Sequence, residues 1–406
     1  MTTVAQDVTE KYADDNIFIP SNIEHGLFTQ YAIDNLDFSE CTLDGTSKHV
    51  TSMVMYQHEQ SDNTLHTGSM TTVPKRVDRR TSLNVPAESI HSAAAIRKLR
   101  RNVHSENTLD AEFLLQQDAE HSTDMNTCWA IARLCPTKLL EVEIDCPGWK
   151  VFNAYISQGN KASTAIGYCP FLQEAPTNPD VVNEALQLCI KSSAKLGLKH
   201  TVVTQDQAIY EISYTMRKES PEKYDNLILR LGGFHLLMNY LRAVGKLMTG
   251  TGLAEILVSS RIMLEGTANK ILAGKGYYQG INAHMRLHEA MYFLWWNAFE
   301  EYCINEEVDM SPFSKLSEKI GQLGDVLNVD TIQSLEKVSQ LTECVTELKQ
   351  LTIRFNDSRS EYKTHQLWLT YIGMIQSVLQ FIHAEREGVW GEHLVAVVDM
   401  AKVIAA

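Results

Sequence analysis

The sequence lacks any long hydrophobic run, because no stretch of its 406 residues approaches the ~20 consecutive apolar residues that a membrane-spanning helix needs. It also begins with MTTVAQDVTEKYADD, which has neither the basic nor the apolar region of a secretory leader. Its eight cysteines are scattered without a CxxC pair, so neither a zinc site nor a disulfide framework is expected. We therefore expect an intracellular protein with reduced thiols and no membrane partner.

Nucleotide-binding signals are missing as well. The glycines of TGTGL and AGKGYYQG do not form a GxxxxGK[ST] loop, and they lie between expected helices rather than after a strand. The N-terminal sequence has no zinc-finger spacing and no evident helix-turn-helix, so no sequence-specific DNA reader is visible. Nucleotide, haem and zinc are not expected as cofactors.

Basic residues are in deficit overall, and the formal net charge of -14 argues against indiscriminate nucleic-acid binding. One segment, residues 75–101, has eight basic side chains against two acidic ones, a local charge of +6. It is either a solvated loop followed by a basic helix, or a patch that contacts DNA phosphates or directs nuclear import. The basic residues are Lys75, Arg76, Arg79, Arg80, Arg97, Lys98, Arg100 and Arg101.

What is present is, first, an acidic strand. Residues 28–38 and 49–57 read as two strands joined by a turn that contains Asp44-Gly45, which predicts an antiparallel hairpin. The first of these strands contains Asp34, Asn35 and Asp37, although such residues are disfavoured in strands. A carboxylate there needs compensation, for example from a metal ion.

Further elements follow along the chain. WKVFNAYIS (149–157) is read as a third strand, and the next segment as a helix that Asp180 caps. HTVV (200–203) is a short strand that runs into Asp206, and a helix and the strand NLILRL (226–231) come next. Beyond Gly252 the apolar residues recur every three to four positions, which predicts an almost wholly helical block.

This order is that of an RNase H-like core: a hairpin with an acid, a third strand, a helix, and a fourth strand that ends at a second acid. We therefore predict an α/β fold, an RNase H-like mixed sheet flanked by helices, with a large helical block. The predicted parts are an N-terminal extension (1–27), the first hairpin (28–74), a basic insertion (75–148), the rest of the core sheet (149–251), a helical insertion (252–381) and a final core helix (382–406).

Three carboxylates are the predicted catalytic residues. Asp34, or its alternative Asp37, and Asp206 would meet at one edge of the sheet, and Glu385 would join them from a helix. Such a cluster needs divalent cations, and oxygen ligands suit Mg or Mn. Two such ions promote phosphodiester cleavage or strand transfer. Asn35 and His235 are the predicted partners that orient these ligands.

Each of these residues also has a purely structural interpretation. Asp34 and Asp37 could be exposed turn acids, Asp206 could cap the helix that follows it, and Glu385 could be a solvated helix-end residue. His235 and His393 could be hydrogen-bonded packing residues. The aromatic face around Trp295 and Trp296, with Phe293 and Phe299, reads as helix core, with base stacking as a remote alternative.

The strings AIDNLDFSECTLDGTSKHVTSMVMYQ, TVVTQDQAIYEIS, LRLGGFHLLMNYLRAVGKLMTGTGL and AEREGVWGEHL resemble those of a group of uncharacterised animal proteins that proliferate as if carried by mobile elements. The resemblance covers residue 28 to the C-terminus and implies a transposase-like organisation, similar to hobo/Activator-type transposases with their helical insertion. Members often carry an acid beside the glycine of LGGFH, where this chain has Gly232-Gly233. The recurrent positions are Asp34, Asn35, Asp37, Asp44, Gly45, His49, Asp206, Gln207, Gly233, His235, Glu385, Trp390 and His393.

The predicted function is that of a nuclear protein derived from a transposable element. Its predicted activity is metal-dependent phosphodiester cleavage or strand transfer on DNA, in a site that has degenerated from that of an active transposase. The alternatives are a non-catalytic DNA- or protein-binding scaffold of the same fold, a helical interaction protein, and a metabolic enzyme of another class. Homo-oligomerisation is left open. The chain ends in VAVVDMAKVIAA without a capping glycine, from which we expect a truncated gene product.

Overall fold

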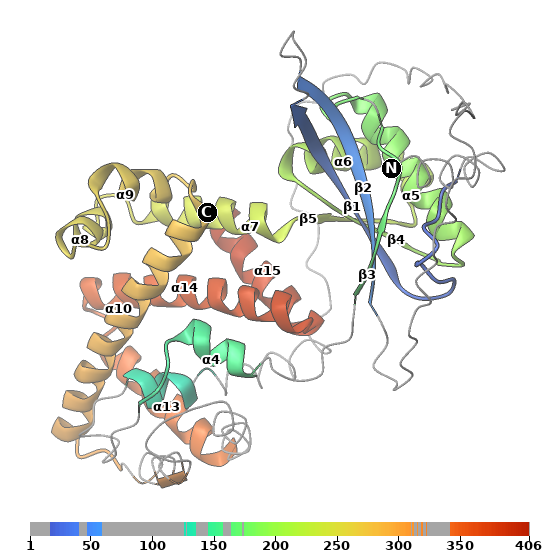
Figure 1. Ribbon diagram of the computed structural model, residues 1–406. Helices are drawn as coiled ribbons and strands as arrows, with labels where there is room; N and C mark the ends of the chain where they lie inside the picture. The colour runs from blue at the N-terminus through green and yellow to red at the C-terminus, as the bar shows by residue number, and fades with distance from the viewer. Residues whose placement is uncertain are drawn as a thin grey trace, which may run out of the picture. The chain divides into compact units, whose positions relative to one another are not determined.

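The computed structural model describes residues 17–39, 47–58, 126, 128–134, 145–156, 164–172, 174–309 and 342–405, and single positions at 311, 315, 318, 319 and 322. Contacts divide the chain into two compact units. The first, here called the sheet unit, consists of Met1–His104 and Lys161–His235, and the second, the helical unit, consists of Ser105–Asn160 and Leu236–Ala406 (Figure 1). Each unit has its own hydrophobic core.

The sheet unit is built on a five-stranded mixed sheet. The strands lie in the order β3-β2-β1-β4-β5. β1 pairs antiparallel with β2, and β2 with β3, whereas β4 pairs parallel with both β1 and β5. The predicted mixed α/β architecture is therefore confirmed. The strands are β1 (Thr29–Ser39), β2 (Ser47–His58), β3 (Thr164–Tyr168), β4 (Thr201–Gln205) and β5 (Leu227–Leu231).

One face of this sheet forms the core of the unit. Tyr31 and Ile33 of β1 and Val203 of β4 are buried, whereas their neighbours in sequence are less so, because successive strand residues point to opposite faces. Two helices, α5 (Pro179–Lys195) and α6 (Gln207–Glu219), supply the other side of this core. The hydroxyl of Ser193 in α5 donates to the Tyr31 phenol oxygen at 3.1 Å and ties the helix to β1.

The expected third strand at 149–157 is wrong. Trp149–Ile156 forms helix α4 of the helical unit. Its buried residues Trp149, Phe152 and Asn153 are spaced three and four apart, which is helical spacing, and Asn153 Nδ2 donates to the Trp149 carbonyl one turn back at 2.9 Å. The period of the buried residues, rather than the β-favouring composition, decides this element.

The true third strand, β3, has the sequence TAIGY, with a glycine near its end. A Cβ at Gly167 would lie 2.8 Å from side-chain atoms of both Pro20 and Ile23, so only glycine allows the N-terminal segment to cross the strand here. The strand is held by pairing with β2, in which Val54 lies opposite Tyr168. A five-residue strand that contains glycine gives little local signal in sequence.

The N-cap of helix α5 lies two residues before the expected one. Asn178, not Asp180, is the N-cap, and its side-chain oxygen accepts from the Asp180 N–H at 3.0 Å. Pro179 occupies the first helical position, where a missing N–H costs nothing. Asp180 lies in the first turn, where its negative charge suits the helix dipole.

The helical unit contains the predicted helical block, whose described parts consist of helices and the turns that connect them, without a strand. The aromatic face around Trp295 is core: the Trp295 ring lies 5.4 Å from that of Phe299 and 5.6 Å from that of Phe355, and Trp296 is 2% exposed. Phe293, by contrast, is exposed. The helices are α7 (Gly233–Leu247), which begins in the sheet unit, α8 (Leu253–Ser259), α9 (Glu265–Leu272), α10 (Tyr277–Asn305), α13 (Thr342–Ser358), α14 (Lys363–Glu387) and α15 (Trp390–Ala405).

Among the helices described here, none is both long and apolar enough to cross a membrane. The described cysteines are buried, and no disulfide joins any two of them. They are Cys128, Cys146, Cys169, Cys189 and Cys303.

Candidate functional site

Asp34 and Asp206 lie at the same edge of the sheet. The parallel register of β1 and β4 pairs Ile33 with Gln205, so Asp34 and Asp206 are the next residues on the two neighbouring strands. On the far side of β4, the Gly232 N–H donates to the Gln205 carbonyl at 2.8 Å, so the chain after β5 also passes this edge. Side chains that follow neighbouring parallel strands gather where ligands bind in open α/β sheets.

The Asp34 carboxylate has a perturbed electrostatic environment although the residue is exposed to solvent. The pKa of Asp34 is raised above its ordinary 3.8, first because nearby protein atoms remove part of its hydration, and further because Asp206 is negatively charged. The Asn35 backbone N–H, which donates to Asp34 Oδ1 at 2.8 Å, and the nearby His235 lower the pKa in part. Asp34, Asp206 and His235 are therefore near enough within the sheet unit to interact electrostatically.

Asp206 has a structural role as well. Its Oδ1 accepts from the Ile209 N–H at 2.8 Å, so Asp206 is the N-cap of α6, and its interpretation as a helix cap is confirmed. The cap uses one carboxylate oxygen. Within the part of the chain that the structure describes, no hydrogen bond or ion pair occupies the other oxygen, Oδ2. A single carboxylate can therefore begin the helix and still offer one oxygen to a ligand.

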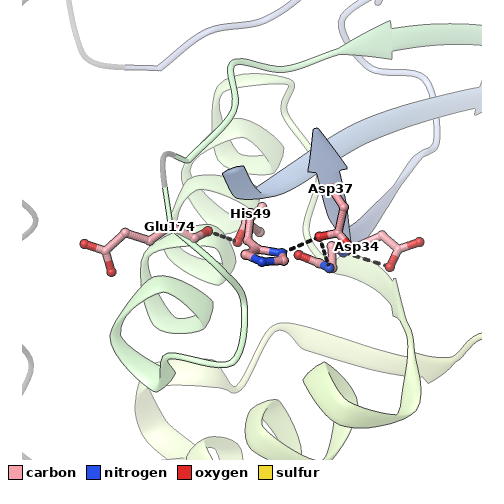
Figure 2. A network of polar contacts seen from close by, with 6 residues as sticks. Asp34, Asp37, His49 and Glu174 are labelled. Atoms are coloured by element: carbon pink, nitrogen blue, oxygen red, sulfur yellow. Dashed lines mark hydrogen bonds and ion pairs between the residues drawn. The ribbon is translucent and has the colours of Figure 1, made fainter. Parts of the chain in front are cut away.

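Asp37 belongs to a different cluster. It lies three residues after Asp34 and hence on the opposite face of β1. Asp37 Oδ1 accepts from Asn35 Nδ2 at 2.7 Å and contacts His49 Nδ1 of β2 at 2.6 Å (Figure 2). These hydrogen bonds, first that of His49, lower the pKa of Asp37. Both acids lie inside β1 rather than in a turn, so the turn interpretation is wrong for each.

The Asn35 side chain lies on the same face of β1 as Asp37 and donates to it, so this side chain does not orient Asp34. The contact of Asn35 with Asp34 is made by the backbone N–H. His49, which we did not predict as a site residue, is the direct cross-strand partner of Asp37. The sequence signal for this pair was the hairpin register itself, which the turn between the strands sets.

Gln205 is a second residue that sequence analysis did not single out. It is 2% exposed, and within the described residues neither its Nε2 nor its Oε1 has a hydrogen-bond partner. It follows Thr201 and Val203 on the helix-covered face of β4, so it lies behind the Asp34–Asp206 edge. The sequence signal that could have identified Gln205 is a polar residue at a position of β4 that the alternation of buried and half-buried residues makes buried.

Glu385 lies in α14 of the helical unit. Its Oε1 is 2.8 Å from Nδ1 of His393 in α15, without the directionality of a hydrogen bond. A matching contact joins His383 Nδ1 to Oε2 of the buried Glu392 at 2.8 Å. His393 is therefore a packing residue that bears an ionic contact, and Glu385 has a partner of its own.

No group of three His, Cys, Asp or Glu side chains that could hold a metal occurs among the residues given structural positions here. Within the sheet unit, Asp34 and Asp206 form a pair at one edge of the sheet, and Asp37 lies on the opposite face of β1. The predicted phosphate-contacting residues lie outside the described ranges: Lys75, Arg76, Arg79, Arg80, Arg97, Lys98, Arg100 and Arg101.

Comparison with protein families gives one match, to a domain of unknown function, DUF8702, over residues 148–406. The chain belongs to the DUF8702 family. The DUF8702 match spans Asp206 and Glu385 and most of the helical unit, whereas β1 and β2, with Asp34, precede it. Searches of the curated proteins and of the solved structures found no match.

Proposed function

We propose that the sheet unit is an RNase H-like core whose Asp34 and Asp206 bind a divalent cation, and that the protein acts, or descends from proteins that acted, on DNA phosphodiesters. The observation that carries the proposal is the strand order β3-β2-β1-β4-β5, in which β1, β2 and β3 are antiparallel and β4 and β5 run parallel to β1. This is the strand order of RNase H-like cores. Asp34 and Asp206 lie directly after the last residues of β1 and β4 that pair with each other. Because one fold serves many functions, the acids and not the fold carry the chemistry.

The two carboxylates fit a hard divalent ion such as Mg or Mn. Their oxygens are the preferred ligand type. The pKa of Asp34 is raised first by the loss of hydration and further by the charge of Asp206, and a cation between the two carboxylates would relieve this repulsion. Asp34 and Asp206 would hold the ion, and the chemistry it would supply is activation of water or a 3' hydroxyl and stabilisation of the leaving oxygen. The chain's contribution is to hold the ligands: β1 fixes Asp34, and the cap of α6 fixes Asp206.

His235 is placed to assist this pair. It lies in the first turn of α7, and its charge interacts with Asp34. A protonated imidazole here would hold the Asp34 carboxylate in its ionised form, ready to bind a cation. Glu385, the third predicted carboxylate, belongs to the helical unit, and its role stays a prediction.

The test is a thermal melt of the full chain with and without Mn. At a Mn concentration ten times the Kd, a site present only in the folded protein stabilises it by about 1.4 kcal/mol, enough for a rise of a few degrees in Tm. We expect this rise in the wild type and its loss in Asp34→Asn and Asp206→Asn. Asparagine keeps the cap at position 206, so the loss would report on the charge and not on the helix.

Asp37→Asn is the matched control. It removes a carboxylate from the same strand but from the opposite face, so its response to Mn should equal that of the wild type. Identical melts of the wild type with and without Mn would overturn the metal site. A response that Asp37→Asn also removes would place the ion elsewhere on β1.

The second candidate is a non-catalytic scaffold of the same fold that binds DNA or protein. The specific observation in its favour is that two of the three proposed acids have structural partners: Asp206 caps α6, and Glu385 contacts His393. A wild type that retains DNA but shows neither a Mn response nor cleavage of labelled DNA would favour the scaffold.

A further inference from the structure

The helical unit contains a buried histidine that has no hydrogen-bond partner among the described residues. His288, in α10, is 1% exposed, and among the described residues neither Nδ1 nor Nε2 finds a partner. Burial lowers the pKa of His288 to about 4, so the ring is neutral at physiological pH. Its neutral imidazole thus offers one donor and one acceptor that the fold does not use.

His284, one turn earlier on the same helix, provides a comparison. It is equally buried, and burial also lowers its pKa to about 4, but its Nδ1 lies 2.9 Å from the hydroxyl of Tyr371 in α14. This contact gives His284 a structural role. His288 has no such contact among the described residues, and a buried polar group without a partner costs stability that an apolar residue of similar size would avoid.

His288 lines a cavity of about 170 Å³, all of whose lining residues belong to the helical unit. Three aromatic residues form part of the wall: Trp129, Trp149 and Tyr292, the last with its ring 5.6 Å from that of His288. The indole nitrogens of both tryptophans are already fixed, since Trp129 donates to the Pro147 carbonyl at 3.0 Å and Trp149 to Asn126 Oδ1 at 3.2 Å. Their indole N–H groups are therefore already used, and the two tryptophans would contact a ligand only through the ring faces or edges.

The polar part of the wall consists of carboxamides. Asn126 and, on α14, Gln376 and Gln380 line the cavity with His288. Each carboxamide carries both donors and acceptors, and none of the lining residues that the structure describes is charged. A strongly anionic or cationic ligand would find no counter-charge among them. A cavity of about 150 Å³ is enough for a benzene ring, so this one accommodates a single or small fused ring.

We propose that this cavity binds a planar, uncharged nitrogen heterocycle of nucleobase size, with its ring against Trp129, Trp149 and Tyr292 and its polar edge bonded to His288 and the carboxamides. Aromatic walls stack on such rings, and Asn and Gln side chains pair with their ring nitrogens and amino groups. This site is independent of the carboxylate pair, which lies in the sheet unit.

The test measures binding to the purified full chain by ligand-observed NMR and by tryptophan fluorescence. All six tryptophans belong to the helical unit, and two of them line the cavity, so fluorescence reports on the correct part of the molecule. The probes are adenine, cytosine and benzimidazole, with toluene as a ring that cannot form hydrogen bonds and tetramethylammonium as a cation. We expect the nitrogen heterocycles to bind at least tenfold more tightly than toluene or tetramethylammonium.

Two variants separate binding from folding. His288→Phe should weaken heterocycle binding at least tenfold and leave Tm unchanged or higher, because it replaces an unpartnered polar ring with an apolar one. His284→Phe should lower Tm, because it leaves the Tyr371 hydroxyl without its partner, and should retain binding. No heterocycle binding, tetramethylammonium binding more tightly than the rings, or a His288→Phe variant that loses stability and binds like the wild type would overturn the proposal.

The same variants distinguish two sources of the ring. If single-stranded oligonucleotides compete with adenine and His288→Phe weakens both, the ligand is a base within a strand. If only the free rings bind, it is a small molecule. Both outcomes support a heterocycle site, because both require the polar edge at His288.

Discussion

The carboxylate of Asp206 ends β4 and begins α6, so its loss has two consequences that substitution can separate. Asp206→Ala should destabilise α6 by about 1 kcal/mol, whereas Asp206→Asn and Asp206→Ser should not, because both retain a capping oxygen for the Ile209 N–H. Hydrogen exchange of the first turn of α6 is the measurement. Equal protection in the alanine and asparagine variants would show that the cap is unimportant.

Asp34 should make stability depend on pH. Its pKa is raised in the folded protein, so it contributes stability that is present below its ordinary pKa of 3.8 and is lost as the pH rises through the folded pKa. In metal-free buffer at pH 7, Asp34→Asn should therefore have a higher Tm than the wild type. The gain should disappear as the pH falls below about 4, and calorimetry at a series of pH values measures it. Solvent at the exposed residue reduces its size.

Asp37, in the same strand, should have the opposite effect on the pH dependence of stability. Its pKa is lowered by His49 and Asn35, so its contribution to stability is present above 3.8 and is lost as the pH falls through the folded pKa. Asp37→Asn should therefore lower Tm at neutral pH, and the loss should shrink in acid and in high salt, since the pair is exposed. A higher Tm for this variant at pH 7 would contradict the assignment.

At the scale of elements, the close approach of α7 to the end of α9 depends on one glycine. A Cβ at Gly245 would lie 2.1 Å from the Leu272 carbonyl oxygen, so Gly245→Ala must move a helix. We expect a loss of roughly 1–3 kcal/mol in the free energy of unfolding of the helical unit, in line with overpacked sites. Urea unfolding followed by tryptophan fluorescence measures it, because every tryptophan belongs to this unit.

Gly266→Ala is the matched control for this prediction. Gly266 lies in α9, and an added Cβ would meet nothing within 4 Å, so alanine should stabilise the helix by about 0.5–1 kcal/mol. Similar effects of the two substitutions would show that helix propensity, rather than the contact with Leu272, determines the role of Gly245.

At the scale of the whole molecule, the charge distribution predicts where DNA would be bound. The chain is acidic overall, yet residues 75–101 carry a local charge of +6. Replacing Arg97, Lys98, Arg100 and Arg101 with Ala should weaken DNA retention and reduce the slope of log K against log salt by as much as ~4, because each phosphate contact contributes about 0.9. Retention on a DNA column at several salt concentrations measures this slope.

The matched control removes four exposed cations from the sheet unit instead. Replacing Lys191, Lys199, Arg217 and Lys218 with Ala changes the net charge equally and should leave the slope nearer to that of the wild type. Equal losses in both variants would mean that only total charge matters and that the basic segment has no special role.

Several elements of the molecule can be predicted from local sequence patterns. Strands β1, β2, β4 and β5 follow from alternating apolar residues between turn signals, and the helices of the helical unit follow from apolar residues three and four apart. These features depend on neighbours within one element. The cap at Asp206 is equally local, because it needs only a polar side chain three residues before a helical N–H.

Other features depend on partners far along the chain. The sequence favoured Asp34 and kept Asp37 as its alternative, and the pairing of β1 with β4 places Asp34 beside Asp206. β3 forms because β2 lies next to it and Gly167 admits the segment that crosses it, and α4 forms where Trp149 and Phe152 enter the helical core.

The sequence by itself thus determined the mixed class, the helical block and the residues able to carry chemistry, since periodicity and capping are properties of neighbouring residues. Tertiary structure alone decided which acids are neighbours and which polar groups, such as His288 and Gln205, find no partner in the part of the chain that the structure describes. The reason is that burial and long-range pairing depend on residues more than a hundred positions apart, such as Gln30 and Val202, and no local pattern encodes that distance.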